Sequence, residues 1–321
     1  MSLRLSVDND AWQSHVTATA RLLGDLLPVV KGNGYGFGRA TLLPHAIALA
    51  PDVAVGTVHE LVDVPTTLRP FVLTPIGSGV VADPSSLTLL RNRNDAVLAV
   101  GSERDLDVLK SIGTKHSVII KVESSMHRYG VAASQATELR RRAESAGHRV
   151  VAWSGHLPLS GSDEDRVAEA RAIADSLATD IPLQVSHIGG AAARLRSVVK
   201  HQVVVRAGTQ LWLGDKSMIA LHADVIAVRT TASTTAGYRA SVVPTGARLV
   251  MVGCGSSHGI TTLDDGLSPF HFAKRRLNML EAPHMHTTML AVTDEPCPNE
   301  GDWVDVQQPM TRVLPDTIAW N

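Results

Sequence analysis

Between about residues 28 and 214 the chain repeats one pattern eight times, and this repetition constrains the fold more than any other feature. Each unit is a short apolar run, then a polar or glycine-rich break, then usually a stretch with helical spacing. Apolar strands that alternate with helices form parallel sheets covered by helices. Eight units favour a closed (β/α)8 barrel over an open doubly wound sheet of five or six strands. The predicted strands are Pro28–Lys31, Asp52–Thr57, Pro70–Pro75, Ala96–Gly101, His116–Glu123, Val150–His156, Leu183–Ile188 and Gln202–Arg206.

The helical spacing is clearest in Ser134–Ala146 and Glu164–Ala178, and it is poorly marked between Gly77 and Arg93. After Gly214 the pattern changes to alternating, threonine- and valine-rich segments separated by turns, which is typical of a β domain. We therefore expect a barrel over residues 1–214 and a mostly β domain over residues 215–321. The strands predicted in the second domain are Asp224–Thr231, Arg248–Gly253, Thr287–Val292 and Trp303–Val306.

The composition is that of a globular protein, with 44% hydrophobic and 19% charged residues. The net charge of −1 without long runs of one sign argues against nucleic acid or an anionic membrane as a partner. Two cysteines, Cys254 and Cys297, make no disulfide framework and fit a reducing compartment. No apolar stretch has the length of a membrane span, and no secretion signal is recognised, so we expect a cytoplasmic protein.

Chemically useful side chains gather where the predicted strands end. The first strand ends in Lys31, the sixth in His156 and the eighth in Arg206. The fifth is followed by Arg128, and the seventh ends at Ser186 and His187. Because the active site of a parallel barrel lies at the carboxyl ends of its strands, these groups are expected at one face. A lysine, imidazoles, arginines and glycine-rich turns suit a phosphorylated, electron-withdrawing cofactor.

Lys31 is the most informative of these residues. Partial burial lowers the pKa of an amine and makes it a carbonyl nucleophile, whereas the alternative is a lysine that merely extends to solvent at a strand end. The turn Gly32–Gly38 is a candidate phosphate cradle through its backbone N–H groups. As a dinucleotide fingerprint this turn is weak. It also lacks the ending of a P-loop.

Five segments together resemble the alanine racemase family of pyridoxal-phosphate enzymes, in which a barrel precedes a β domain. Residues 29–38 are similar to that family's Val-Lys-Ala-Asn-Ala-Tyr-Gly-His-Gly motif, and residues 121–130 to its Lys-Val-Asp-Thr-Gly-Met-x-Arg-x-Gly motif. Residues 205–209 resemble Val-Arg-Pro-Gly-Ile, and Gly237-Tyr238 resembles Gly-Tyr-Gly. Residues 283–286 stand where the family has Val-Cys-Met-Asp. The segments occur in family order over nearly the whole chain.

The resemblance implies an amino-acid racemase, a homodimer that acts on a free amino acid with pyridoxal 5'-phosphate. Lys31 would hold the cofactor and act as one base, and Tyr238 from the partner subunit would be the second acid and base. Arg128, supported by Lys121, would steer the substrate carboxylate. The other implied cofactor contacts are Tyr35, Ser186, Gly190, Gly208 and Thr209 at the phosphate, His156 against the ring and Arg206 beside the pyridine nitrogen.

The chain departs from the family pattern mainly at its substrate end. The family's Asn-Ser after the seventh strand is replaced by His187–Ala191, so backbone N–H groups or Ser186 would have to bind the phosphate. Cys254 replaces a tyrosine, and His286 replaces an acidic residue. The final tyrosine-bearing segment is shortened or replaced around residues 311–313. We therefore expect a racemase whose substrate need not be alanine.

Two other functions remain open from the sequence. One is a metal-assisted D-amino-acid lyase, similar to D-threonine aldolase or D-serine dehydratase, because His284 and His286 alternate on a predicted strand and could ligate zinc. His258 and His271 are near them in sequence; even so, we expect no metal site. The other is a non-catalytic carrier of the cofactor. Each site residue also has a plain structural alternative: a hydrogen-bonded histidine for His156, an interface tyrosine for Tyr238 and an ion pair for Arg206.

Overall fold

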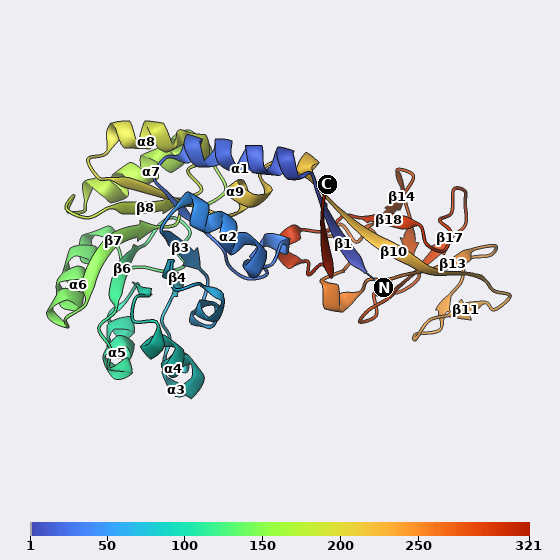
Figure 1. Ribbon diagram of the computed structural model, residues 1–321, viewed down its shortest axis with the longest axis horizontal. Helices are drawn as coiled ribbons and strands as arrows, with labels where there is room; N and C mark the ends of the chain where they lie inside the picture. Colours follow the sequence, from blue (N-terminus) through green and yellow to red (C-terminus); the bar gives the residue numbers. More distant parts are fainter. Residues whose placement is uncertain (1) are drawn as a thin grey trace. The chain divides into compact units, whose positions relative to one another are not determined.

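The computed structural model describes residues 2–321, which form two compact units (Figure 1). The first, the barrel unit, contains His15–Gly32 and Arg39–Gly214. The second, the β unit, contains residues 2–14, Asn33–Gly38 and Asp215–Asn321.

Eight parallel strands form the centre of the barrel unit, in the order β2-β9-β8-β7-β6-β5-β4-β3. The order ends at β2 and β3, which are joined by a bridge between Val29 and Ala54 and by a hydrogen bond of 2.8 Å from Val30 N to Ala54 O. The (β/α)8 architecture predicted from the eight apolar runs is therefore confirmed. The strands are β2 Leu26–Pro28, β3 Asp52–Val55, β4 Arg69–Pro75, β5 Val97–Val100, β6 Ser117–Val122, β7 Arg149–Gly155, β8 Leu183–Ser186 and β9 Val203–Ala207.

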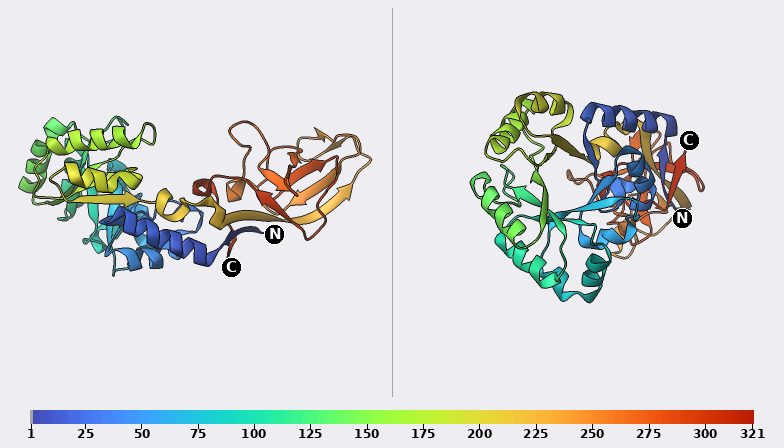
Figure 2. Two further views of the ribbon diagram at one scale, coloured as in Figure 1. Left: turned by 90° about the horizontal axis from the view of Figure 1, so that it is seen from above. Right: turned by 60° about the vertical axis from the view of Figure 1, so that its left-hand side comes forward.

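Helices lie outside this sheet and cover it, as the right-hand view of Figure 2 shows. The helices are α1 Asn9–Leu23, α2 Arg39–Leu49, α3 Ser78–Ala82, α4 Pro84–Asn92, α5 Glu103–Ile112, α6 Ala133–Ser145, α7 Asp163–Asp175, α8 Ala192–Val198 and α9 Thr209–Leu213. The poorly marked region after Gly77 is two short helices, because the Asp83 side chain caps α4 by accepting from the Ser85 and Ser86 N–H groups. Single-turn 3-10 helices are η1 Gly34–Gly36, η3 Gly189–Ala191, η4 Lys216–Met218, η5 Ser256–His258 and η6 Met310–Arg312, and η2 spans Val58–Asp63.

The sheet strands of the barrel unit are buried almost throughout, which explains their lack of alternation. All four residues of β5 are buried, and five of the six in β6 are. Near the end of β2 the indole N–H of Trp212 on α9 donates to the Val29 carbonyl at 2.9 Å. This contact fixes the backbone two residues before Lys31.

The β unit is built around the long strand β10, which pairs with β1, β13 and β18. Its strands are β1 Leu3–Val7, β10 Ile219–Thr230, β13 Arg248–Val252, β14 Phe270–Phe272, β15 Arg275–Arg276, β16 Asn278–Met279, β17 Thr288–Val292, β18 Trp303–Val306 and β19 Thr317–Trp320. A separate hairpin is made of β11 Thr235–Ala236 and β12 Ser241–Val242. The mostly β character of this part is confirmed, and the four strands predicted there are β10, β13, β17 and β18.

The units differ from the expected boundaries at two segments. Residues 2–14 join the β unit because β1, whose side chains alternate between buried and half-buried, pairs with β10 and β19. Residues 33–38 join it because Nδ2 of Asn33 donates to the carbonyls of Met310 (2.8 Å) and Val313 (2.6 Å). The compact barrel unit therefore leaves out two segments of the domain expected over residues 1–214.

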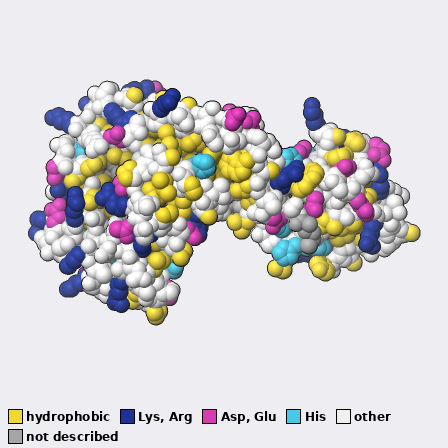
Figure 3. Space-filling view, in the orientation of Figure 1, with side chains coloured by type: hydrophobic (Ala, Val, Ile, Leu, Met, Phe, Trp, Pro, Cys, Tyr) yellow, Lys and Arg dark blue, Asp and Glu magenta, His cyan; other side chains and the backbone are white. Residues whose placement is uncertain are grey.

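Charged side chains of both signs are scattered over the face drawn in Figure 3, in keeping with the near-neutral net charge. Over residues 2–321, the helices all fall short of the length and apolarity that a bilayer crossing requires.

Candidate active site

Lys31 lies three residues beyond β2, in a turn that is fixed on both sides. Glu60 on η2 accepts hydrogen bonds from Gly32 N (3.1 Å) and Gly56 N (2.6 Å). Arg39 donates to the Gly32 carbonyl and pairs with Asp63. The backbone beside the lysine is therefore held by side chains from neighbouring elements, so that its amine projects from a fixed position.

The surroundings of Lys31 favour its neutral, nucleophilic form. Partial burial lowers the pKa of its amine, and the positive charges of Arg128 and Arg206 lower it further, while Glu60 opposes them. The residue as a whole still reaches solvent. A lysine with a lowered pKa and an open approach is the arrangement that carbonyl addition needs.

Arg206 on β9 is buried, with 3% of its surface exposed. Its Nη1 donates to Oγ of Ser154 and its Nη2 to the Gly155 carbonyl at 2.8 Å. A weaker contact of 3.4 Å joins Nη1 to the carbonyl of Gln184. Within residues 2–321 its acceptors are thus a hydroxyl and backbone carbonyls rather than a carboxylate, so it is not the rim ion pair considered from sequence. Burial, aided by Arg128, lowers the pKa of Arg206 to about 10, which leaves it charged at neutral pH.

The ends of β7 and β8 bring two imidazoles together. Nδ1 of His156 shares a hydrogen bond of 2.5 Å with the hydroxyl of Ser186, and the rings of His156 and His187 lie 4.7 Å apart. Nδ1 of His187 donates to the Leu157 carbonyl at 2.7 Å. Burial, followed by the charge of Arg206, lowers the pKa of His156 to about 2, so its imidazole is neutral. The hydroxyl of Ser186 thus has a partner in His156. The phosphate contact predicted for Ser186 stays a prediction.

Arg128 lies in the loop between β6 and α6. A small pocket groups Arg128 with Lys121 and His156. The Ser124 hydroxyl ties this loop to β7 by donating to the His156 carbonyl at 2.6 Å. Lys121 is 3% exposed, and its ammonium donates to the carbonyl of Leu73 at 3.3 Å. Burial lowers the pKa of Lys121 well below its ordinary value, and Arg206, Arg128 and Lys31 act in the same direction.

These side chains make the centre of the site strongly cationic. Besides burial, the charge of Arg128 lowers the pKa of Lys31, Lys121 and Arg206, while the charge of Glu60 raises that of Lys31. Such a cluster is stabilised by a bound anion, and it suits a ligand that carries a phosphate and a carboxylate.

Three further predicted residues lie in turns after β8 and β9. Gly190 is exposed, and a Cβ built on it meets no atom within 4 Å. Gly208 precedes α9, and Thr209 is its first residue. The contact of these three residues with a phosphate stays a prediction.

The turn after Lys31 is not built as the phosphate cradle suggested by its glycines. Gly36 N and Gly38 N donate to the Asn33 carbonyl, and Phe37 N donates to that of Gly34. With Gly32 N bound to Glu60, four N–H groups of the turn already have acceptors. Tyr35 in this turn is 6% exposed and has a left-handed backbone with φ 55°. Tyr35 belongs to the β unit, and its phosphate contact stays a prediction.

Tyr238 also lies in the β unit, on the turn of the β11–β12 hairpin, and 87% of its surface is exposed. Its ring lies 4.3 Å from that of His284. A role for Tyr238 in catalysis stays a prediction.

The two histidines considered as zinc ligands form hydrogen bonds with other side chains. His284 and His286 lie in a bend before β17, not on the predicted strand, so strand alternation does not place them on one face. Nε2 of His284 bonds to Glu281 (2.5 Å), and Nδ1 of His286 bonds to the hydroxyl of Ser257 (2.9 Å). Among residues 2–321, histidine, cysteine, aspartate and glutamate side chains form no group of three or more that could hold a metal ion.

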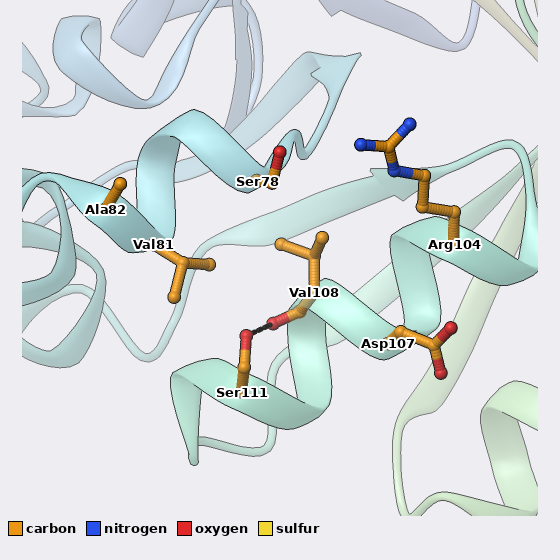
Figure 4. Close-up of a pocket in the computed structure, with 7 residues that line it drawn as sticks. All are labelled: Ser78, Val81, Ala82, Arg104, Asp107, Val108 and Ser111. Atoms are coloured by element: carbon orange, nitrogen blue, oxygen red, sulfur yellow. Dashed lines mark hydrogen bonds between the residues drawn. The ribbon is translucent and has the colours of Figure 1, made fainter.

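A second hollow lies between helices of the outer layer rather than at the strand ends. It is lined by Val81 and neighbouring residues of α3 and by Arg104, Asp107 and Val108 of α5 (Figure 4). The single hydrogen bond drawn there joins the Ser111 hydroxyl to the Val108 carbonyl within α5. This hollow has no group of catalytic side chains comparable to that around Lys31.

Sequence reasoning missed two residues that shape the site. Ser154 binds Arg206, and its position two residues before His156 on one strand was a usable signal, because alternate strand residues share a face. Glu60 holds the turn beside Lys31, and its sequence neighbourhood carries no motif that points to this task.

The family of the chain follows from direct comparison. Residues 7–216 match the family model of the N-terminal domain of alanine racemase. The "Alanine racemase" of Macrococcus caseolyticus is 26% identical over 193 residues, which are 58% of this chain and 50% of that protein. The chain thus spans about half the length of this curated relative.

Solved structures of alanine racemases share the fold over nearly the whole chain. The biosynthetic alanine racemase of Pseudomonas aeruginosa is 20% identical, with a TM-score of 0.70 and coverage of 96% of this chain and 91% of that one. The Bartonella henselae enzyme, solved with covalently bound pyridoxal phosphate, is 17% identical with a TM-score of 0.71, covering 97% and 91%. The enzyme of D-cycloserine producing Streptomyces lavendulae is 16% identical with a TM-score of 0.72, covering 100% and 97%. The chain therefore belongs to the alanine racemase family, as the motifs around Lys31 and Arg128 predicted.

Proposed function

We propose that the protein is a pyridoxal-phosphate-dependent amino-acid racemase. The observation that carries the proposal is the combination of two cationic side chains at the strand ends. Lys31 is an amine of lowered pKa, and Arg206 is a buried cation that has no carboxylate partner among residues 2–321. The pyridoxal phosphate bound covalently in the Bartonella henselae enzyme supports the same cofactor here. The substrate is a free α-amino acid, and it need not be alanine.

The residues present fit the cofactor chemically. Lys31 would hold it covalently, Arg206 would face its pyridine nitrogen and His156 would lie against its ring. Its phosphate would lie among Tyr35, Ser186, Gly190, Gly208 and Thr209. When bound, the cofactor withdraws electrons from the substrate's α-carbon and so makes the α-proton acidic.

Arg206 determines how strongly those electrons are withdrawn. An arginine has no proton acceptor, so Arg206 would leave the pyridine nitrogen of the cofactor unprotonated and the cofactor a weaker electron sink. A weaker sink limits the lifetime of delocalised negative charge. Decarboxylation and transamination are then suppressed, while removal and return of a proton remain accessible.

Racemisation requires a proton to leave one face of the α-carbon and another to arrive at the opposite face. Lys31 would serve one face, and Tyr238 of a partner subunit would serve the other. A tyrosine is ordinarily protonated at neutral pH, so it can donate while the amine accepts. Arg128 would orient the substrate carboxylate between them. The 87% exposure of Tyr238 supports a role toward a second copy of the chain in a homodimer.

The test is to incubate the cofactor-loaded protein with single L- and D-amino acids and to follow inversion by chiral chromatography. We expect inversion of at least one amino acid, lost on Lys31→Ala. Metal-dependent cleavage would instead support the lyase, and a loaded protein that inverts no amino acid would support the carrier. Either result would contradict the proposal.

A further inference from the structure

We propose that Glu281 is a positioning residue for Tyr238: its carboxylate clamps the hairpin turn that presents the tyrosine. This inference rests on the proposed function, because it takes Tyr238 to be the second acid and base. It goes beyond the family resemblance, which assigns no role to Glu281.

The hairpin that carries Tyr238 is too small to hold its own shape. Its strands β11 and β12 have two residues each, paired as Thr235 with Val242 and Ala236 with Ser241. Isolated two-stranded hairpins are marginally stable even when longer. The turn must therefore be fixed by contacts from outside the hairpin if Tyr238 is to occupy one position.

Glu281 supplies these contacts. Its Oε1 accepts from Tyr238 N at 2.9 Å, and its Oε2 accepts from Arg239 N at 3.1 Å and from the Ser241 hydroxyl at 3.1 Å. Gly237, with φ 79°, allows the approach, since a Cβ there would lie 2.3 Å from Oε1 of Glu281. One carboxylate thus accepts hydrogen bonds from two backbone N–H groups and one hydroxyl of the hairpin.

His284 completes the cluster on the other side of the carboxylate. Its Nε2 bonds to Oε1 of Glu281 at 2.5 Å, and its ring packs against that of Tyr238. The bend that carries His284 is itself anchored, because Ser256 N donates to the His284 carbonyl at 2.7 Å and His284 N donates to the Thr287 carbonyl at 2.9 Å. The turn is therefore tied to the main sheet of the β unit.

The carboxylate of Glu281 is ionised at neutral pH. The Glu281 side chain is only 4% exposed, and this burial raises its pKa. Hydrogen bonds from His284, Arg239, Tyr238 and Ser241 lower the pKa more strongly, to about 2, so the carboxylate stays ionised. A permanently ionised acceptor fits a positioning role rather than a proton-transfer role.

The experiment compares Glu281→Ala and Glu281→Gln with Tyr238→Phe. The matched control is Glu300→Gln, since Glu300 is another carboxylate of the β unit that accepts a backbone N–H, that of Val228 at 3.0 Å. Amide hydrogen exchange is measured at Tyr238 and Arg239. Inversion and α-deuterium incorporation are measured separately in heavy water on the cofactor-loaded dimer.

We expect Glu281→Ala to raise amide exchange at Tyr238 and Arg239 about tenfold and to lower inversion by at least tenfold. In both Glu281→Ala and Tyr238→Phe, deuterium should still enter, with retention of configuration, the enantiomer whose α-proton faces Lys31. Glu281→Gln retains one acceptor oxygen and should fall between Glu281→Ala and the wild type. Glu300→Gln should match the wild type in all three measurements.

Two results would overturn the proposed role of Glu281. One is amide exchange that is unchanged in Glu281→Ala. The other is an equal fall, in that variant, of inversion and of deuterium incorporation with retention of configuration. A wild-type protein that inverts no amino acid would overturn the proposed function instead, and with it the catalytic purpose of the turn. In that case amide exchange still decides whether Glu281 holds the hairpin.

Discussion

The guanidinium of Arg206 bridges Ser154 and Gly155 with two nitrogens, and this shape is as important as its charge. Arg206→Lys retains the charge but offers one nitrogen, so one of the two acceptors loses its partner. A charged hydrogen bond is worth about 1.5–3 kcal/mol, so we expect kcat/KM for inversion to fall by roughly 10- to 100-fold. Steady-state kinetics measure this loss.

The control for Arg206→Lys is Arg196→Lys in the same unit. Arg196 also donates to backbone carbonyls, those of Leu23 and Val203, but lies outside the cluster around Lys31. An equal loss in both variants would show that the effect is structural.

The amine of Lys31 should react at a lower pH than an ordinary lysine, because burial and two arginines lower its pKa from 10.5. In the cofactor-free protein, its rate of labelling by an amine-reactive reagent should reach its midpoint below that value. Glu60→Gln removes the charge that opposes this shift and should move the midpoint further down. Mass spectrometry of the labelled peptide over a pH series measures both. A midpoint at 10.5 would contradict this view of the site.

Among the connecting elements, the loop after β6 depends most visibly on a glycine. Gly130 has φ 113°, and an added Cβ would lie 2.7 Å from Glu123 N. Gly130→Ala should therefore shift the segment that carries Arg128 and lower the free energy of unfolding by about 1–3 kcal/mol.

Urea unfolding measures the stability effect of Gly130→Ala, and the KM for the amino acid reports the displaced Arg128. Gly79→Ala is the control, because Gly79 lies in α3 with open space around it and an ordinary φ. A Gly130→Ala protein with unchanged stability and KM would show that the loop tolerates the side chain.

The elements of the barrel were predictable because their signal is local. Strands buried on both faces read as continuous apolar runs, and a helical segment follows each strand along the chain. β1 and β19 were missed because their partners are far away in the sequence. β1 pairs with β10 across more than 200 residues and with β19 across more than 300. Such pairing leaves no local pattern. The two-residue strands β11, β12, β15 and β16 are too short to show alternation at all.

The site was predictable where a motif or a strand end marked it, as for Lys31, His156 and Arg206. Its supporting contacts were not, because they are made by residues that are ordinary in sequence. Glu60 and Glu281 bind backbone N–H groups 28 to 43 residues away, and only the folded chain brings these together.

At the scale of the whole molecule, stability should decline as the pH falls below neutral. Burial lowers the pKa of several histidines, including His116, His148, His156 and His187, below 6.5. These imidazoles are neutral when folded and bind protons more readily when unfolded. Their contribution is complete above about pH 6.5 and is lost as the pH falls through that value toward the lower folded pKa values.

Urea titrations between pH 5 and 8 measure this dependence. His148→Gln should make the decline shallower, because it removes one of the buried imidazoles that protonate on unfolding. A midpoint that is constant over this range would contradict the account.

If the active site is shared, two inactive variants should complement each other. In a heterodimer of Lys31→Ala with Tyr238→Phe, one site keeps both an intact lysine and an intact tyrosine. Random mixing makes about half of the dimers heterodimers, so inversion should recover to about a quarter of the wild-type value. Separate tags and native mass spectrometry verify the mixing. Heterodimers without activity would show that both groups serve the same subunit or that Tyr238 is not a base.

We expect two different groups to handle the α-proton. NMR of the product formed early in a reaction in heavy water can show whether they do. NMR of the first few per cent of turnover should show product that carries α-deuterium beside unreacted substrate that retains its α-hydrogen. This pattern arises because one base removes a proton while the other delivers a deuteron from the solvent. Product that retains the hydrogen of the substrate would mean that a single base serves both faces. That result would contradict the assignment of Lys31 and Tyr238.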